Sequence, residues 1–157
     1  RFIEVGMGMY HYTECGLKDV WLLNGFKELS TPYGKAVSVD RADLLDRAIA
    51  GLLVDKPRKL RGAEFRFLRK QLPQSQVSLA TAWGLSHETV AKWERTGNLP
   101  AMADRFIRAY WKEVQDGNAH IVELLARLAS ADAASNNGNV QEKIVLKETR
   151  SGWKQAA

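Results

Sequence analysis

Between residues 62 and 113, apolar side chains recur at the spacing of helices, and residues that end helices separate the groups. Phe65, Leu68 and Leu72 predict a helix over 62–72 that ends at Pro73. After Gly97 and Pro100, a further helix over 101–113 has an apolar face formed by Ala103, Phe106, Ile107 and either Tyr110 or Trp111. Two shorter helices lie between these, so the pattern predicts a four-helix module.

The two shorter helices have the spacing of a helix-turn-helix. If Gln76 is position 1, Ala80 is position 5, where only a small side chain lets two helices cross closely. Gly84 is position 9, where a tight turn requires the positive φ that glycine adopts without strain. The apolar plug between the helices is predicted to consist of Leu79, Leu85, Val90 and Trp93. Ser75 and Ser86 stand where each helix needs an N-cap.

Residues 1–55 predict a small sheet with one helix packed on it. The strand-like stretches YHYT and VWLLNGFKEL precede Lys35–Val39, and Asn24-Gly25 is the dipeptide preferred in two-residue hairpin turns. A second turn is expected at 31–34. Asp40 is expected to cap a helix over 41–54, in which Leu44, Leu45, Ala48 and Leu52 recur at helical spacing.

Residues 114–157 predict a helix near 118–130 with an apolar stripe, a flexible linker in SADAASNNGN, and one strand near 143–148. The stripe consists of Ile121, Leu124, Leu125 and Leu128. The expected fold is therefore α+β in three parts: a β/α part over 1–55, an all-α helix-turn-helix domain over 56–113, and a C-terminal helix plus strand over 114–157. The C-terminal part is expected to form a homodimer.

The composition limits which classes of protein and which kinds of site are compatible with the chain. Apolar content of 45% is enough for a core, and no apolar run approaches the roughly 20 residues of a membrane span. The first residues lack the apolar stretch of a secretory signal, so we expect a cytoplasmic protein without membrane contact. A single cysteine, Cys15, argues against an intrachain disulfide or a multi-cysteine zinc site, and we expect no metal and no cofactor.

The net charge of +5 is unevenly distributed. Residues 56–113 carry 12 Lys/Arg against 5 Asp/Glu, whereas residues 1–55 carry 6 against 8 and residues 114–157 carry 5 against 5. The positive charge therefore coincides with the helix-turn-helix spacing. This coincidence is typical of a protein that binds double-stranded DNA.

The second helix of the pair would enter the major groove with its first residues toward the bases. The expected base-reading residues are His87, Glu88, Thr89 and Lys92. Lysine donates to guanine, glutamate accepts from cytosine, and threonine contacts a thymine methyl group. The expected phosphate contacts are Gln76, Ser86, Arg95, Arg66, Lys70, Arg58, Lys59 and Arg61.

The middle part resembles the Xre (lambda-repressor-like) family, on the residues LRGAEFRFLRKQLPQSQVSLATAWGLSHETVAKWE at 60–94. With YHYTECGLKDVWLLNGF at 10–26 and TPYGKAVSV at 31–39, the chain is similar to the MqsA-like group of bacterial antitoxins and repressors. The resemblance implies an ion pair between the first helix and the end of the second helix of the helix-turn-helix, here Arg69 and Glu94. Zinc-binding members of that group carry cysteine pairs, which this chain lacks.

Several functions are compatible with parts of the sequence. The favoured one is a sequence-specific transcriptional regulator, most simply a repressor on a palindromic operator. The alternative is an antitoxin that neutralises a toxin protein and represses its own operon. An enzyme with a thiol site at His11, Glu14 and Cys15 lacks an evident oxyanion donor, so we expect no catalysis. An RNA-binding sheet with stacking aromatics is not evident, and we assign the tryptophans to the core, Trp93 first.

Overall fold

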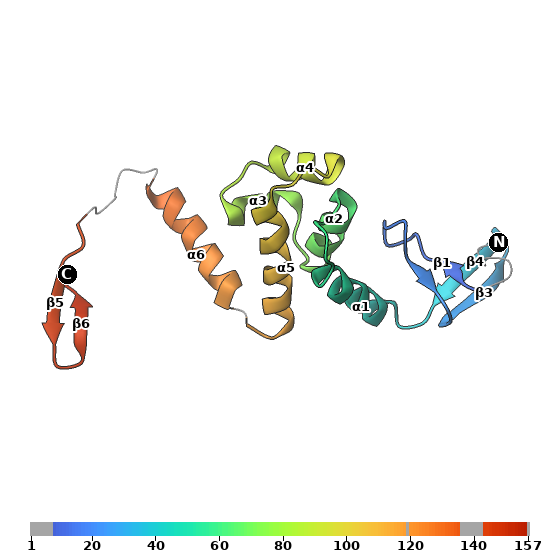
Figure 1. Ribbon diagram of the computed structural model, residues 1–157, viewed down its shortest axis with the longest axis horizontal. Coiled ribbons are helices and arrows are strands. Elements are labelled where there is room, and N and C mark those ends of the chain that lie inside the picture. The colour runs from blue at the N-terminus through green and yellow to red at the C-terminus, as the bar shows by residue number, and fades with distance from the viewer. Residues whose placement is uncertain (1–7, 119, 136–142, 157) are drawn as a thin grey trace.

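The computed structural model describes residues 8–118, 120–135 and 143–156. The fold is α+β: a body of helices is flanked by small N-terminal hairpins and by a C-terminal hairpin (Figure 1). Within the described residues, no helix is long and apolar enough to cross a membrane.

The four helices predicted for residues 62–113 are present. They are α2 (Gly62–Gln71), α3 (Gln76–Trp83), α4 (His87–Thr96) and α5 (Ala101–Gln115). Phe65, Leu68 and Ile107 are fully buried at the centre of this body, and α2 packs against both α4 and α5. Helical periodicity therefore identified the buried face of α2 and most of that of α5, although Phe106 is only partly buried.

Helix α1 (Ala42–Val54) forms where it is predicted, but its buried face is different. The buried residues are Ile49, Ala50 and Leu53, whereas Leu44 is 47% and Leu52 is 75% exposed. The reason is that α1 packs against α2 and α5, which the local pattern could not indicate. The predicted cap is also wrong: Arg41 occupies the N-cap position at φ 46°, and no side chain caps the helix.

The strands near the N-terminus pair differently from the prediction. Strands β1 (Tyr10–His11) and β2 (Trp21–Leu22) form one antiparallel pair, and β3 (Phe26–Thr31) and β4 (Gly34–Val39) form another. Gly25 has a positive φ of 81°, but Asn24-Gly25 joins two strands that do not pair with each other. The second expected turn, between Thr31 and Gly34, does close a hairpin.

The C-terminal part also departs from the prediction. Helix α6 (His120–Ser135) runs through the first half of the expected linker, and residues 136–142 lie outside the described residues. The expected single strand is one arm of a hairpin, in which β5 (Leu146–Thr149) pairs with β6 (Gly152–Gln155). Trp153 in this hairpin and Trp21 in β2 are exposed, so the assignment of all tryptophans to the core is wrong.

One close backbone approach fixes α2 against α4. Gly62, the first residue of α2, lies against the C-terminal turn of α4, and a Cβ added there would be 2.2 Å from the backbone oxygen of Glu94. That distance is far below van der Waals contact. Only glycine fits at position 62 without moving the backbone of one helix.

We therefore expect Gly62→Ala to lower the free energy of unfolding by about 1–3 kcal/mol, the usual cost of overpacking. Gly51→Ala is the matched control, because its Cβ would meet only the Trp111 ring at an ordinary 3.9 Å. Replacing that glycine within α1 should stabilise the protein by about 0.5–1 kcal/mol. Urea unfolding of both variants measures the contrast, and similar midpoints for the two would contradict the close approach.

Candidate nucleic-acid interface

The α3–α4 pair is defined by two serine caps and one glycine turn. The Ser75 hydroxyl accepts a hydrogen bond from the Ser78 backbone N–H (3.0 Å), and the Ser86 hydroxyl accepts one from that of Thr89 (3.3 Å). Gly84 ends α3 at φ 70°, ψ 32°, the left-handed conformation that glycine adopts at little cost. These caps set where both helices begin and where α3 ends, and Gly97, also left-handed at φ 74°, ends α4.

The contact between these helices is apolar and closely packed. Leu79 and Val90 are fully buried, and Ala80 and Trp93 are buried beside them. The Trp93 ring meets the Phe65 ring edge-on, at 5.9 Å between centroids, which ties the pair to α2. Leu85, expected in the same plug, is instead 37% exposed in the turn.

Burial of Val90 and Trp93 leaves a polar face on the other side of α4. Glu88, Lys92 and Arg95 are spaced i, i+4 and i+7, so they share this outward face, and all three are exposed. His87 is exposed at the first turn, where its ring lies 3.3 Å from the Glu88 carboxylate. Thr89 is half-buried beside Val90, and its hydroxyl is bonded to that of Ser86 (2.8 Å). Of the four predicted base readers, Glu88 and Lys92 therefore lie in an outward row with Arg95, a predicted phosphate contact, and His87 and Thr89 flank it.

The far end of α4 is held by a buried ion pair. Arg69 Nε donates to Glu94 Oε2 at 2.6 Å and Arg69 Nη2 donates to Oε1 at 3.0 Å, which is the bidentate geometry. The side chains are 8% and 5% exposed. Arg69 also donates to the Gln74 carbonyl, and Gln76 donates its side-chain amide to Glu94 (3.0 Å). Gln76, expected at a phosphate, thus also serves this network.

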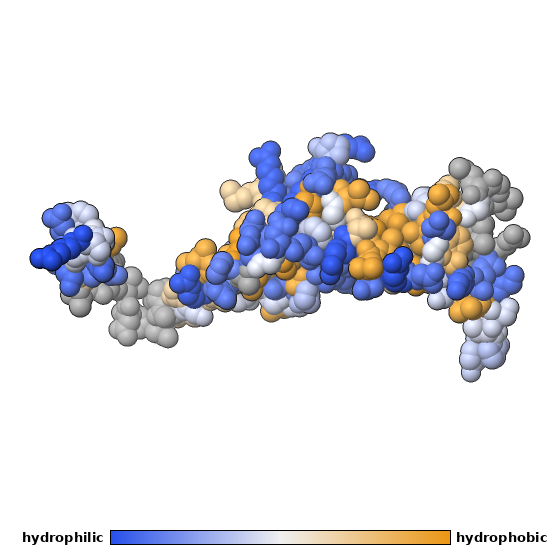
Figure 2. All heavy atoms as spheres, turned by 90° about the horizontal axis from the view of Figure 1, so that it is seen from below, coloured by the Kyte–Doolittle hydropathy of each residue, from blue (hydrophilic) through white to orange (hydrophobic). Residues whose placement is uncertain are grey.

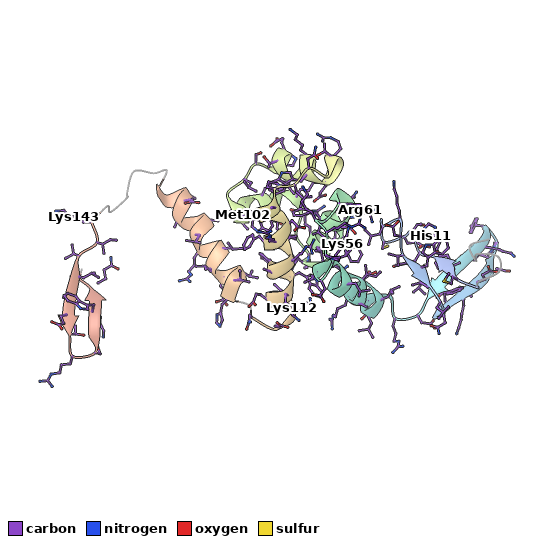
Figure 3. All side chains as sticks on the ribbon, in the orientation of Figure 1. His11, Lys56, Arg61, Met102, Lys112 and Lys143 are labelled. Atoms are coloured by element: carbon purple, nitrogen blue, oxygen red, sulfur yellow. The ribbon has the colours of Figure 1, made fainter. Side chains whose placement is uncertain are left out.

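The basic residues of 56–113 fall into two groups. One group is bound within the fold: Lys56 pairs with Glu64 at 2.6 Å, Lys59 donates to the Leu99 carbonyl, and Arg61 pairs with Asp19 at 2.6 Å. Figure 3 shows Lys56 and Arg61 where the helices meet the N-terminal segment. The other group is exposed and has no ion pair with a described residue: Arg58, Arg66, Lys70, Lys92, Arg95 and Arg105.

Sequence reasoning missed a second buried network, centred on Asp104 and Arg108. The Asp104 carboxylate accepts from the Leu60 backbone N–H (2.8 Å) and from Arg108 (2.9 Å). Arg108 also donates to the carbonyls of Lys56 and Arg58, so it fastens the segment between α1 and α2 onto α5. The i, i+4 spacing on α5 was the only local signal, because the carbonyl partners are about 50 residues away in sequence.

Glu64 connects this segment to α2. Burial acts to raise the pKa of the Glu64 carboxyl, but hydrogen bonds from the Lys56 ammonium and the Arg61 backbone N–H outweigh it, and the pKa is lowered overall. The carboxylate is therefore charged near neutral pH and completes a capping box at the start of α2.

His11 and Cys15, two of the residues considered for a thiol site, take part in separate interactions. The His11 ring stacks on Trp21 with centroids 4.1 Å apart, and its Nε2 is 2.5 Å from the Lys18 carbonyl oxygen. The Cys15 thiol donates to the Tyr12 carbonyl, and burial raises its pKa, the opposite of the shift that activates a nucleophilic cysteine. Among the described residues, no cluster of three or more His, Cys, Asp or Glu side chains could hold a metal ion.

Comparison of the chain with protein-family models, with curated proteins and with solved structures finds no significant match.

We expect Glu94→Ala to lower the free energy of unfolding by about 3–5 kcal/mol, because it leaves the buried Arg69 guanidinium without its carboxylate. Glu88→Ala is the matched control on the same helix, since its side chain is 78% exposed and its ion pair is with the exposed His87. That change should cost less than about 1 kcal/mol. Chemical unfolding of the two variants tests the difference, and a Glu94→Ala curve that overlays the wild type would rule out a stabilising pair.

Proposed function

We propose that the chain is a sequence-specific regulator of transcription that binds double-stranded DNA through α3 and α4. The observation that carries this proposal is the outward face of α4. It combines the exposed acceptor of Glu88 with the donors of Lys92 and Arg95, whereas Val90 and Trp93 anchor the opposite face. Such a helix, held along one side and polar along the other, suits insertion into the major groove.

Two further features support DNA as the partner. The capped start of α4 places backbone N–H groups and His87 at the end expected to enter the groove, where a helix dipole favours the phosphate backbone. The exposed cations Arg66 and Lys70 lie one turn apart on α2, which packs directly against α4. They are candidates for phosphate contacts that add affinity without sequence preference.

We further propose that the protein acts as a homodimer. One such helix contacts only a few base pairs, so a two-fold dimer on a palindrome with half-sites roughly 34 Å apart supplies the missing specificity. Helix α6 supports this arrangement because its apolar stripe is not used up within the chain. Leu124 and Leu128 of this stripe stay exposed although α6 packs against α3 and α5. Repression then follows from occupancy of an operator.

Selection of DNA from a random pool should return a palindrome. On that site, Lys92→Ala should cost about 1–3 kcal/mol of binding free energy and relax the preference at one position, because it removes a base contact. Lys70→Ala should instead weaken specific and random DNA by the same factor, since a phosphate contact carries no sequence information. Fluorescence anisotropy on both duplexes measures this, and equal losses on the two for Lys92→Ala would sink the assignment.

The proposed homodimer leads to a separate prediction. Light scattering should give twice the chain mass for the wild type. Leu124→Glu with Leu128→Glu should shift the mass to that of the monomer, because the two changes would bury charge in the interface. The control is Leu44→Glu with Leu52→Glu, which places the same charge on two exposed leucines of α1 outside the stripe. A monomer mass for the wild type, at concentrations that saturate the operator, would refute the dimer.

A further inference from the structure

The C-terminal hairpin, β5 and β6, is set apart from the helical body. It pairs only with itself among the described residues, and Figure 1 shows it beyond the end of α6. A two-stranded hairpin alone is marginally stable in water, so it needs a surface to bind. The chemistry of its two faces indicates what that surface is.

One face of the hairpin is cationic. The register places Lys147 directly opposite Lys154, and partners that are opposite in an antiparallel pair project from the same face. Their Cβ atoms are therefore roughly 5 Å apart, a like-charge placement that weakens the hairpin unless an anion lies over it. Arg150 stands in the turn that joins the strands, and Lys143 precedes β5.

No acidic residue of the described chain neutralises these cations. Residues 143–156 contain four basic side chains against one acidic one, Glu148. Glu148 is opposite Trp153 and so lies on the other face. Lys147, Arg150 and Lys154 are exposed and form no ion pair with any described residue. Figure 2 shows the hairpin, at the left end, as mainly hydrophilic, in contrast to the apolar areas of the helical body.

The hairpin is tethered close to the proposed DNA-binding pair. Asp132, near the end of α6, lines a cavity of about 490 Å³ together with Gly84 and Leu85, the turn between α3 and α4. The chain therefore leaves the helical body beside that turn. The residues numbered 136–145 allow a reach of at most about 35 Å, the length of one helical turn of DNA.

From this charge and this position, we infer that the hairpin is a second DNA contact, in which Lys147, Lys154 and Arg150 bind the phosphates that flank the site read by α4. The inference rests on the proposed DNA-binding function. In this arrangement the DNA phosphates supply the negative charge that offsets the repulsion between Lys147 and Lys154. Helix α4 then reads the bases, and the hairpin adds salt-dependent affinity.

The test compares two duplexes: the selected operator alone, and the same operator extended by about 10 base pairs on each side. For the full-length wild type, the plot of log affinity against log salt should be steeper on the extended duplex by about 2.7 per protomer, since each of the three phosphate contacts contributes about 0.9. Lys147→Gln with Lys154→Gln should remove about two thirds of this difference, because Arg150 remains, and should leave the affinity for the short duplex unchanged. Flanking protection in hydroxyl-radical footprints should weaken in the same variant.

Lys27→Gln with Lys35→Gln is the matched control, because it removes the same charge from exposed lysines of the other two-stranded hairpin, β3 and β4. That control should keep the full difference in slope. The inference is overturned if the wild type shows equal slopes on both duplexes, or if the two double variants behave alike. Failure of the proposed function looks different: selection then returns no sequence, and Lys92→Ala changes nothing on any duplex.

Discussion

A buried carboxylate at the end of α4 is the interaction on which the arrangement of the helices depends. Glu94 accepts hydrogen bonds from two guanidinium nitrogens of Arg69 in α2 and from the side-chain amide of Gln76 in α3, so a single side chain joins three helices. The same turn of α4 meets the start of α2 at Gly62, where there is no room for a Cβ. A bidentate pair has one good geometry, and a backbone contact has little tolerance. Together they fix the direction of α4 relative to its neighbours, whereas apolar packing alone would leave it freer to slide.

This anchoring is concentrated at one end of α4, and that has consequences for function. The C-terminal turn is tied by Glu94, Trp93 and the glycine contact, whereas the N-terminal turn is held by its serine cap and by Val90 and projects polar side chains from its other side. A helix that reads DNA bases needs this asymmetry. Its N-terminal end has to stay accessible while residues elsewhere hold its position to within a fraction of an ångström. The network around Asp104 and Arg108 repeats the strategy one layer away, where it holds the segment before α2 that brings Gly62 into place.

Local signals in the sequence were sufficient for the caps and the turn of the α3–α4 pair, although the local cap predicted at Asp40 was wrong. The cap at Ser86 and the turn at Gly84 depend on hydrogen bonds and dihedral angles within a few residues. Both could therefore be predicted directly from the sequence. Helix α1 shows the limit: ADLLDRAIAGLLV has apolar residues around most of its circumference, and only its packing against α2 and α5 selects Ile49 and Leu53 over Leu44 and Leu52. Asn24-Gly25 failed for the same reason, since β2 finds its partner in β1 across the chain and not across the turn. Gly62 had no local signal at all, because its constraint comes from a backbone carbonyl in another helix.

The charge available to a partner depends on contacts across the whole fold, so counting charges along the sequence overstated the surface proposed to face DNA. Arg69, Arg108 and Lys56 belong to the basic segment, yet each is bound to carboxylates or carbonyls inside the fold, and Arg61 is shared between Asp19 and Glu64. Residues 143–156 belong to a C-terminal segment whose charges balance in the count, yet their four basic side chains are all exposed. What matters for binding a polyanion is the charge left over after the fold has satisfied its own carboxylates and carbonyls, and that remainder lies on the outward face of α4, on one side of α2, and on the hairpin. Affinity for DNA would then be spread over separate elements, with the rigid one reading bases and the tethered one following the backbone.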